Sequence, residues 1–209
     1  RHTLGGPGYV PPSDKLTIGY VGCGTQGMRE MVRLIQNPEI QIVSVCDPNK
    51  FTTDYVDWSL HGIRNSIREA LDDDSWAEGV EGIPGGRDIG QDFVQRYYGK
   101  NTPGGTYKGC PSYEDFREMF EEEQDIDAIK VMTPDHLHAT ISIAAIRKGM
   151  HVVIHKPIAN RLDEAGKVFA VAREHPEVST HLLAWSIRPG YDRALAWIKD
   201  GAIGKLKEI

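Results

Sequence analysis

The sequence predicts an α/β fold, a doubly wound parallel sheet with helices on both faces. Short apolar runs alternate with segments in which apolar residues recur every three or four positions, as strands and helices do in such sheets. A glycine-rich turn follows the first apolar run, and an acidic residue ends the second. The chain of 209 residues is long enough for one such domain, expected at 16–185, and part of another.

The amino-terminal half of this domain opens as a βαβ unit. A strand is expected at 16–21, a helix at 25–36, and a second, β-branched strand at 40–46. The helix follows from Met28, Met31, Val32 and Ile35, which fall on one face at helical spacing.

The carboxyl-terminal half repeats the alternation. Ser112, followed by Asp115, predicts the cap of a helix, and Asn160 predicts the cap of another. The remaining expected elements are strands at 128–132, 151–155, 181–185 and 202–209, a helix at 136–148, a helix after residue 160 with Leu162, Ala165, Val168 or Phe169, and Ala172 on its inner face, and a helical stripe of Tyr191, Ala194, Leu195 and Ile198.

Two segments interrupt this rhythm. Residues 1–15 are rich in glycine and proline and predict an extended arm. Residues 51–87 predict an inserted excursion after the second strand, in which Leu60, Ile63, Ile67 and Leu71 form a helical stripe. The excursion can cover the cofactor, make subunit contacts, or decorate the surface without a function.

Composition excludes several classes of protein. The 24 Lys and Arg against 30 Asp and Glu give a net charge of −6, which argues against a nucleic-acid partner. No apolar run reaches the roughly 18 residues that would cross a bilayer, so no membrane partner is expected. The three cysteines and the scattered histidines complete no metal-ligand set, so we expect no metal.

The turn Gly22-Cys23-Gly24-Thr25-Gln26-Gly27 is a G-x-G-x-x-G sequence between a strand and a helix. Gly22 would permit the tight turn, Gly24 would let a diphosphate approach the backbone, and Gly27 would let helix and strand pack closely. The amides at the helix start, around Thr25 and Gln26, would then face the phosphates. A glycine turn without a ligand is the alternative interpretation.

Asp47 follows the last motif glycine by 20 residues and ends the second strand. A carboxylate there can accept hydrogen bonds from an adenosine ribose. Its charge favours NAD over NADP, which remains possible because Lys50 could approach a 2′-phosphate.

Further polar residues end later strands of the predicted sheet. Thr133 and Pro134 follow one strand, and His155 and Lys156 end the next. Since the carboxyl ends of parallel strands form the ligand crevice, Lys156 can polarise a substrate hydroxyl and stabilise a developing alkoxide. A surface lysine in a turn is the alternative.

These motifs, taken in order, resemble the glucose–fructose oxidoreductase / inositol dehydrogenase / MocA family (Gfo/Idh/MocA). The matching stretches are residues 18–27, 45–48, 127–138 and 149–157, with Trp185, Arg188 and Asp200-Gly201-Ala202-Ile203-Gly204 resembling the entry into the second domain. The resemblance implies a Rossmann NAD(P)-binding domain, followed at 186–209 by only the start of an α+β substrate domain. It also places His138 near the nicotinamide.

The resemblance implies an oxidoreductase that acts on a CH–OH group of a sugar, glycoside or cyclitol. A small carbohydrate or polyol is then the partner, and a homo-oligomer would form through the missing second domain, without which the chain is catalytically incomplete. One residue departs from the family: His155 stands where the family has glutamate before Lys156-Pro157. His155 can tune Lys156, contact the cofactor or fill space, and the Lys156-Pro157 bond is a candidate for cis geometry.

Two other functions stay open. One is an NAD-dependent glycoside hydrolase or lyase that recycles its cofactor, and the other is a non-catalytic dinucleotide-binding module. The proline-rich start resembles exported family members, which predicts a periplasmic location with a cytoplasmic one as the alternative.

Overall fold

The computed structural model describes residues 11–57, 59, 61–100, 102, 104–183, 191–205 and 207–208. Six parallel strands form one sheet in the order β3-β2-β1-β4-β5-β6, which confirms the doubly wound fold. The strands are β1 Leu16–Val21, β2 Ile40–Cys46, β3 Ser112–Tyr113, β4 Ala128–Val131, β5 His151–His155 and β6 Thr180–Leu183.

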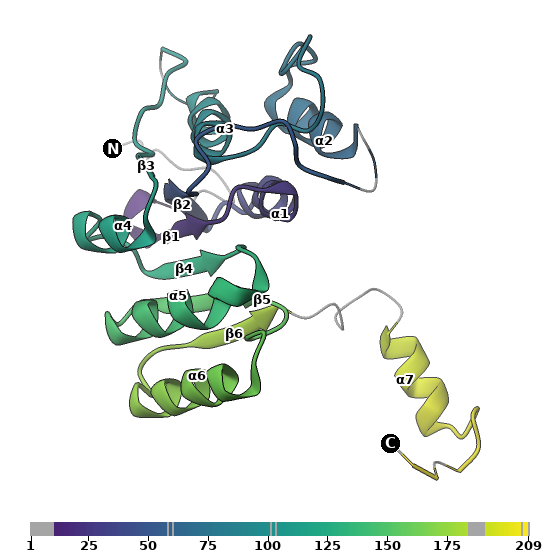
Figure 1. Ribbon diagram of the computed structural model, residues 1–209. Helices are drawn as coiled ribbons and strands as arrows, with labels where there is room; N and C mark the ends of the chain where they lie inside the picture. Colours follow the sequence, from purple (N-terminus) through teal and green to yellow (C-terminus); the bar gives the residue numbers. More distant parts are fainter. Residues whose placement is uncertain are drawn as a thin grey trace, which may run out of the picture.

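Helices cover both faces of the sheet (Figure 1). A short 3₁₀ helix at Pro12–Asp14 precedes β1. The α-helices are α1 Thr25–Leu34, α2 Gly62–Leu71, α3 Arg87–Gly99, α4 Phe116–Glu122, α5 Asp135–Arg147, α6 Leu162–Glu174 and α7 Tyr191–Lys199.

Two apolar cores lie on opposite faces of the sheet, because side chains alternate along each strand. Tyr20 of β1 points into the core beneath α1, α2 and α3. Val21, the next residue, points into the core beneath α4, α5 and α6. The crossover from β1 to β2 and the crossover from β4 to β5 therefore leave opposite faces, which places the switch in strand order between β1 and β4.

The excursion after β2 is part of the first core. Ile63, Ile67 and Leu71 of α2 are buried, and so are Trp76 and Ile83 beyond it. The helix is the one that the stripe predicts, although Leu60 lies outside the described residues. The apolar face of α2 is thus covered by α1 and α3.

The two predicted helix caps are wrong. Ser112 does not cap a helix but pairs with Val45 in the short strand β3, and α4 is capped by Asp115, which accepts a hydrogen bond from the Arg117 amide at 2.9 Å. Asn160 does not cap α6, where Arg161 occupies the cap position without a side-chain bond.

The inner face of α6 differs from the predicted one only at its start. Of the two alternatives Val168 is buried and Phe169 is 58% exposed, and Ala172 packs against the core, whereas Leu162 is 91% exposed. Leu162 occupies the first turn, where the chain enters from the loop after β5, and the buried stripe begins only with the half-buried Ala165.

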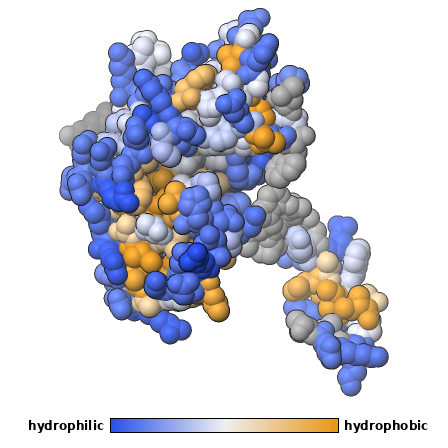
Figure 2. Space-filling view, in the orientation of Figure 1, coloured by the Kyte–Doolittle hydropathy of each residue, from blue (hydrophilic) through white to orange (hydrophobic). Residues whose placement is uncertain are grey.

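The end of the chain forms α7, as the stripe predicts, but no strand. Residues 202 and 203 lie in a turn and 205 in a bend, and none of the six described strands pairs with them to accept the hydrogen bonds that a strand would make. None of the α7 residues is buried, and its apolar side chains gather on the surface in Figure 2. Trp185 and Arg188 lie outside the described residues.

Candidate functional site

The glycine turn joins β1 to α1 at the centre of the sheet. Gly22 has a φ of +104°, and a Cβ on it would lie 2.6 Å from the carbonyl of Met132. A Cβ on Gly27 would lie 2.0 Å from the Gly22 oxygen. Both positions therefore require glycine, the first for its backbone angle and the second for the close packing of helix on strand.

The start of α1 fits an anionic ligand. Gly24 occupies the cap position, and no side chain accepts a hydrogen bond from the first turn. The Thr25 hydroxyl instead donates to the Val56 carbonyl at 3.0 Å, and the Gln26 amide oxygen accepts from Arg29 at 2.6 Å. Neither side chain accepts a hydrogen bond from the first turn, which leaves its amides for phosphate oxygens.

Asp47 links the end of β2 to the glycine turn. One carboxylate oxygen accepts from the Cys23 amide at 2.7 Å, and the other accepts from the Asn49 amide at 2.9 Å. Burial raises the pKa of Asp47 above its ordinary value, and the two backbone hydrogen bonds oppose that shift. Only 5% of the residue is exposed, so Asp47 orders the loop, and its contact with a ribose stays a prediction.

Arg87 is a cation at this corner that the sequence analysis missed. Its guanidinium donates to the carbonyls of Asp47 and Pro48 at 3.1 and 2.8 Å, and it pairs with Glu114 at 2.9 Å. No pattern in the sequence marks this residue, because its partners lie 27 to 40 positions away.

The carboxyl end of β4 offers an unsatisfied polar atom. The Thr133 hydroxyl is buried and has no hydrogen-bond partner among the described residues. It directly follows Met132, whose carbonyl lies against Gly22, so it borders the glycine turn. A buried hydroxyl without a partner is costly, and a bound ligand would satisfy it. Pro134 beside it is exposed and precedes α5.

His138 holds two of the strand-end loops together. It is fully buried, with Nδ1 2.6 Å from the Pro157 carbonyl oxygen and Nε2 2.8 Å from the Thr133 carbonyl oxygen. Both ring nitrogens thus face backbone oxygens, and the position of His138 near a nicotinamide stays a prediction. His138 positions the loop after β4 against the loop after β5.

Lys156 is exposed at the end of β5, and the Lys156-Pro157 bond is cis, as expected. His155 precedes it, with Nδ1 3.1 Å from the Lys156 carbonyl oxygen. Burial, opposed by that hydrogen bond, lowers the pKa of His155 below its ordinary value, so the ring is neutral at pH 7. A neutral ring places no second charge beside Lys156.

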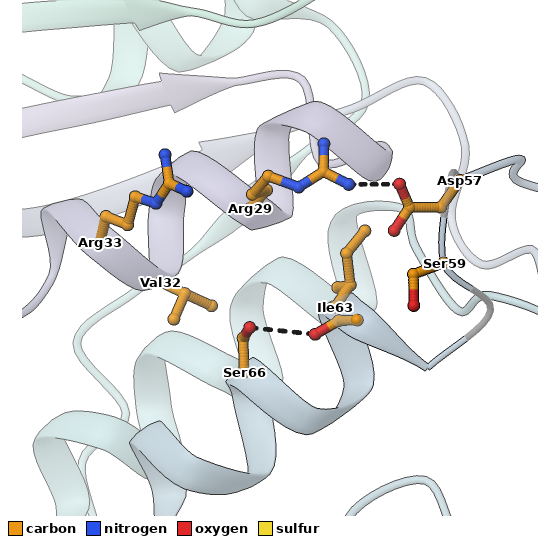
Figure 3. A pocket seen from close by; sticks show the side chains of 8 residues that line it. Arg29, Val32, Arg33, Asp57, Ser59, Ile63 and Ser66 are labelled. Atoms are coloured by element: carbon orange, nitrogen blue, oxygen red, sulfur yellow. Dashed lines mark hydrogen bonds and ion pairs between the residues drawn. The ribbon is translucent and has the colours of Figure 1, made fainter. Parts of the chain in front are cut away.

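The cavity in Figure 3 is distinct from this site. Its volume is about 230 Å³, and it lies between α1 and α2 rather than at the strand ends. Arg29 and Asp57 pair across it, and none of the predicted cofactor residues lines it.

Other reactive groups in the described ranges do not form a second site. Burial raises the pKa of Cys46 and of Cys110 to about 12, which excludes reactive thiolates. No group of three metal-ligating side chains occurs within the described part, and no helix there is long and apolar enough to span a membrane.

The residues present fit a nicotinamide dinucleotide. Two obligatory glycines fix the turn between β1 and α1, and the uncapped start of α1 provides amides for the diphosphate. The unsatisfied Thr133 hydroxyl lies across the switch in strand order. Together they occupy the crevice at which such sheets bind dinucleotides.

Comparisons with known proteins support this assignment. Residues 105–181 match the model of the oxidoreductase family with an NAD-binding Rossmann fold. Levoglucosan dehydrogenase of Pseudarthrobacter phenanthrenivorans is 33% identical over 97 residues, which cover 46% of this chain and 24% of that protein.

Two solved structures share the fold. Scyllo-inositol dehydrogenase from Lactobacillus casei, with bound NAD(H) and scyllo-inositol, superposes with a TM-score of 0.59 at 18% identity, over 91% of this chain and 43% of that one. A 3-ketoreductase from Actinomadura kijaniata, with TDP-benzene and NADP, gives 0.57 at 19% identity, over 92% and 46%.

The chain spans less than half the length of each of these relatives. The sheet order and the glycine turn agree with the fold of these structures. Over residues 105–181 the chain is thus similar to the oxidoreductase family with an NAD-binding Rossmann fold, the Gfo/Idh/MocA family.

Proposed function

We propose that this chain carries the dinucleotide-binding domain of an NAD(P)-dependent oxidoreductase that acts on a CH–OH group of a sugar, glycoside or cyclitol. The observation that carries the proposal is the uncapped start of α1 at the end of β1, with the unsatisfied Thr133 hydroxyl at the end of the neighbouring strand β4. The relatives that match the chain include dehydrogenases and reductases of such compounds.

The bound nicotinamide would supply the hydride chemistry. The amides at the start of α1 would hold the diphosphate, and the Thr133 hydroxyl would bind the nicotinamide half. The exposed Lys156 would donate a hydrogen bond to the substrate oxygen and stabilise its developing charge. His138 would fix the carbonyls on either side of this position.

Asp47 favours NAD over NADP. Its carboxylate accepts a hydrogen bond from the Cys23 amide, and a 2′-phosphate bound beside it would add like charge. Further catalytic groups, the homo-oligomer contacts and a periplasmic location belong to the same proposal, and they depend on parts of the protein beyond the described residues.

Oxidation by the full-length protein tests this function. We expect NADH to accumulate when the protein is mixed with NAD and a panel of cyclitols, aldoses and glycosides, measured by absorbance at the nicotinamide band. Product formation without net NADH would instead support the hydrolase or lyase with a recycled cofactor. Binding of NADH without turnover of any compound would support a non-catalytic module.

A further inference from the structure

The segment between β2 and α3 carries an aromatic ring to the glycine turn. The ring of Tyr55 lies between Gly24 and Gly85. A Cβ on Gly24 would come within 3.1 Å of the ring, and a Cβ on Gly85 within 2.4 Å. Side chains at either glycine would therefore displace the ring, which forms a wall beside the second glycine of the motif.

Hydrogen bonds fix this wall to the turn. The Tyr55 hydroxyl accepts from the Asn49 side-chain amide at 3.2 Å, and the Asn49 backbone amide donates to Asp47 at 2.9 Å. Asp47 in turn accepts from the Cys23 amide at 2.7 Å. The Gly86 amide donates to the Cys23 carbonyl at 3.0 Å, so both sides of the ring are anchored.

The hydroxyl keeps one hydrogen for a ligand. A tyrosine hydroxyl is both donor and acceptor, and here its acceptor side receives the Asn49 amide. Burial raises the pKa of Tyr55 above its ordinary value, so the hydroxyl is protonated at neutral pH. The oxygen lies 3.5 Å from the place that a Gly24 Cβ would take, next to the amides that start α1.

We propose that Tyr55 is a cofactor-binding residue, whose hydroxyl donates a hydrogen bond to a diphosphate oxygen of the bound dinucleotide. The inference rests on the proposed function, because it needs the diphosphate at the glycine turn. The excursion at 51–87 then contributes to the affinity for the cofactor, because it supplies the Tyr55 hydroxyl as a hydrogen-bond donor. The three-glycine motif contains no such donor.

Calorimetric titrations of the wild-type chain and of Tyr55→Phe test this role. The substitution keeps the ring between Gly24 and Gly85 and removes only the donor. We expect the Kd for NADH and for ADP-ribose to rise about tenfold, the effect of one hydrogen bond to a charged group. The Kd for reduced nicotinamide mononucleotide, which has no diphosphate bridge, should stay unchanged.

Tyr97→Phe on α3 is the matched control. Tyr97 is also half-buried, and its hydroxyl has no hydrogen-bond partner within the described ranges, so its loss should leave the Kd for NADH unchanged. Equal affinities of wild type and Tyr55→Phe for ADP-ribose would overturn the inference and leave the proposed function intact. Tighter binding by Tyr55→Ala would also overturn it, since the ring would then block the site. A wild-type chain that binds no dinucleotide would remove the proposed function itself.

Discussion

Replacing Lys156 with methionine in the full-length protein should lower kcat at least about 100-fold, the usual contribution of a positioned proton donor or acceptor. Methionine keeps the length of the side chain but cannot donate to the substrate oxygen or stabilise its charge. The residue is exposed at the end of β5, so the fold does not depend on it. The Kd for NADH should change less than about threefold, because the change removes an interaction of the transition state.

Lys167→Met is the matched control for this experiment. Lys167 lies on the surface of α6, where 68% of its side chain is exposed and it pairs at 3.6 Å with Asp163. The same loss of charge there should leave kcat at the wild-type value, since exposed pairs contribute little. Near-normal turnover by Lys156→Met would remove Lys156 from the chemistry.

Replacing Gly27 with alanine should lower the free energy of unfolding by about 3 kcal/mol or more, at the upper end of overpacking changes. The added Cβ would lie 2.0 Å from the Gly22 carbonyl oxygen, which is backbone and cannot rotate away. This clash is relieved only if α1 moves away from β1. That movement also displaces the amides at the start of the helix. Urea denaturation measures the first effect, and titration with NADH should show no binding.

Gly166→Ala gives the opposite expectation on another helix. A Cβ on Gly166, inside α6, would meet no atom within 4 Å. Alanine there should raise the free energy of unfolding by about 0.5–1 kcal/mol, because it restricts the unfolded chain. A Gly27→Ala variant as stable as wild type would show that the close packing at the turn is not required.

The sequence predicts those parts of the site that depend on neighbouring residues. The glycine turn, the strand before it and α1 follow from one continuous stretch, and Gly22 and Gly27 have the restricted geometry that their spacing indicates. The strand end at Lys156 and its cis bond are likewise local features.

The parts that the sequence did not predict depend on distant contacts. Strand β3 has only two residues, which are too few to show the alternation of apolar and polar side chains. It is formed by its pairing with β2. The ring of Tyr55 lies between Gly24 and Gly85. This arrangement requires the chain to fold back, because Gly85 follows Tyr55 by 30 positions. The contact of the His138 ring with the Pro157 carbonyl oxygen, at 2.6 Å, likewise joins residues that are 19 positions apart.

The cofactor role of Asp47 shows the same limit. Its position after the second strand predicts an acceptor for ribose, but the sequence cannot show that the Cys23 and Asn49 amides occupy its oxygens. The residues that face a ligand depend on how the excursion closes over this corner. Tyr55 and Arg87 thus came only from the structure.

Amide chemical shifts of the isotope-labelled chain, recorded while NADH is added, test the account most directly. We expect the amides of Gly24, Thr25, Gln26 and Gly27 to shift the most, together with Thr133, while those of α6 around Gly166 stay in place. Saturable binding that leaves the four amides of the glycine turn unshifted would contradict the assignment of the diphosphate to the start of α1.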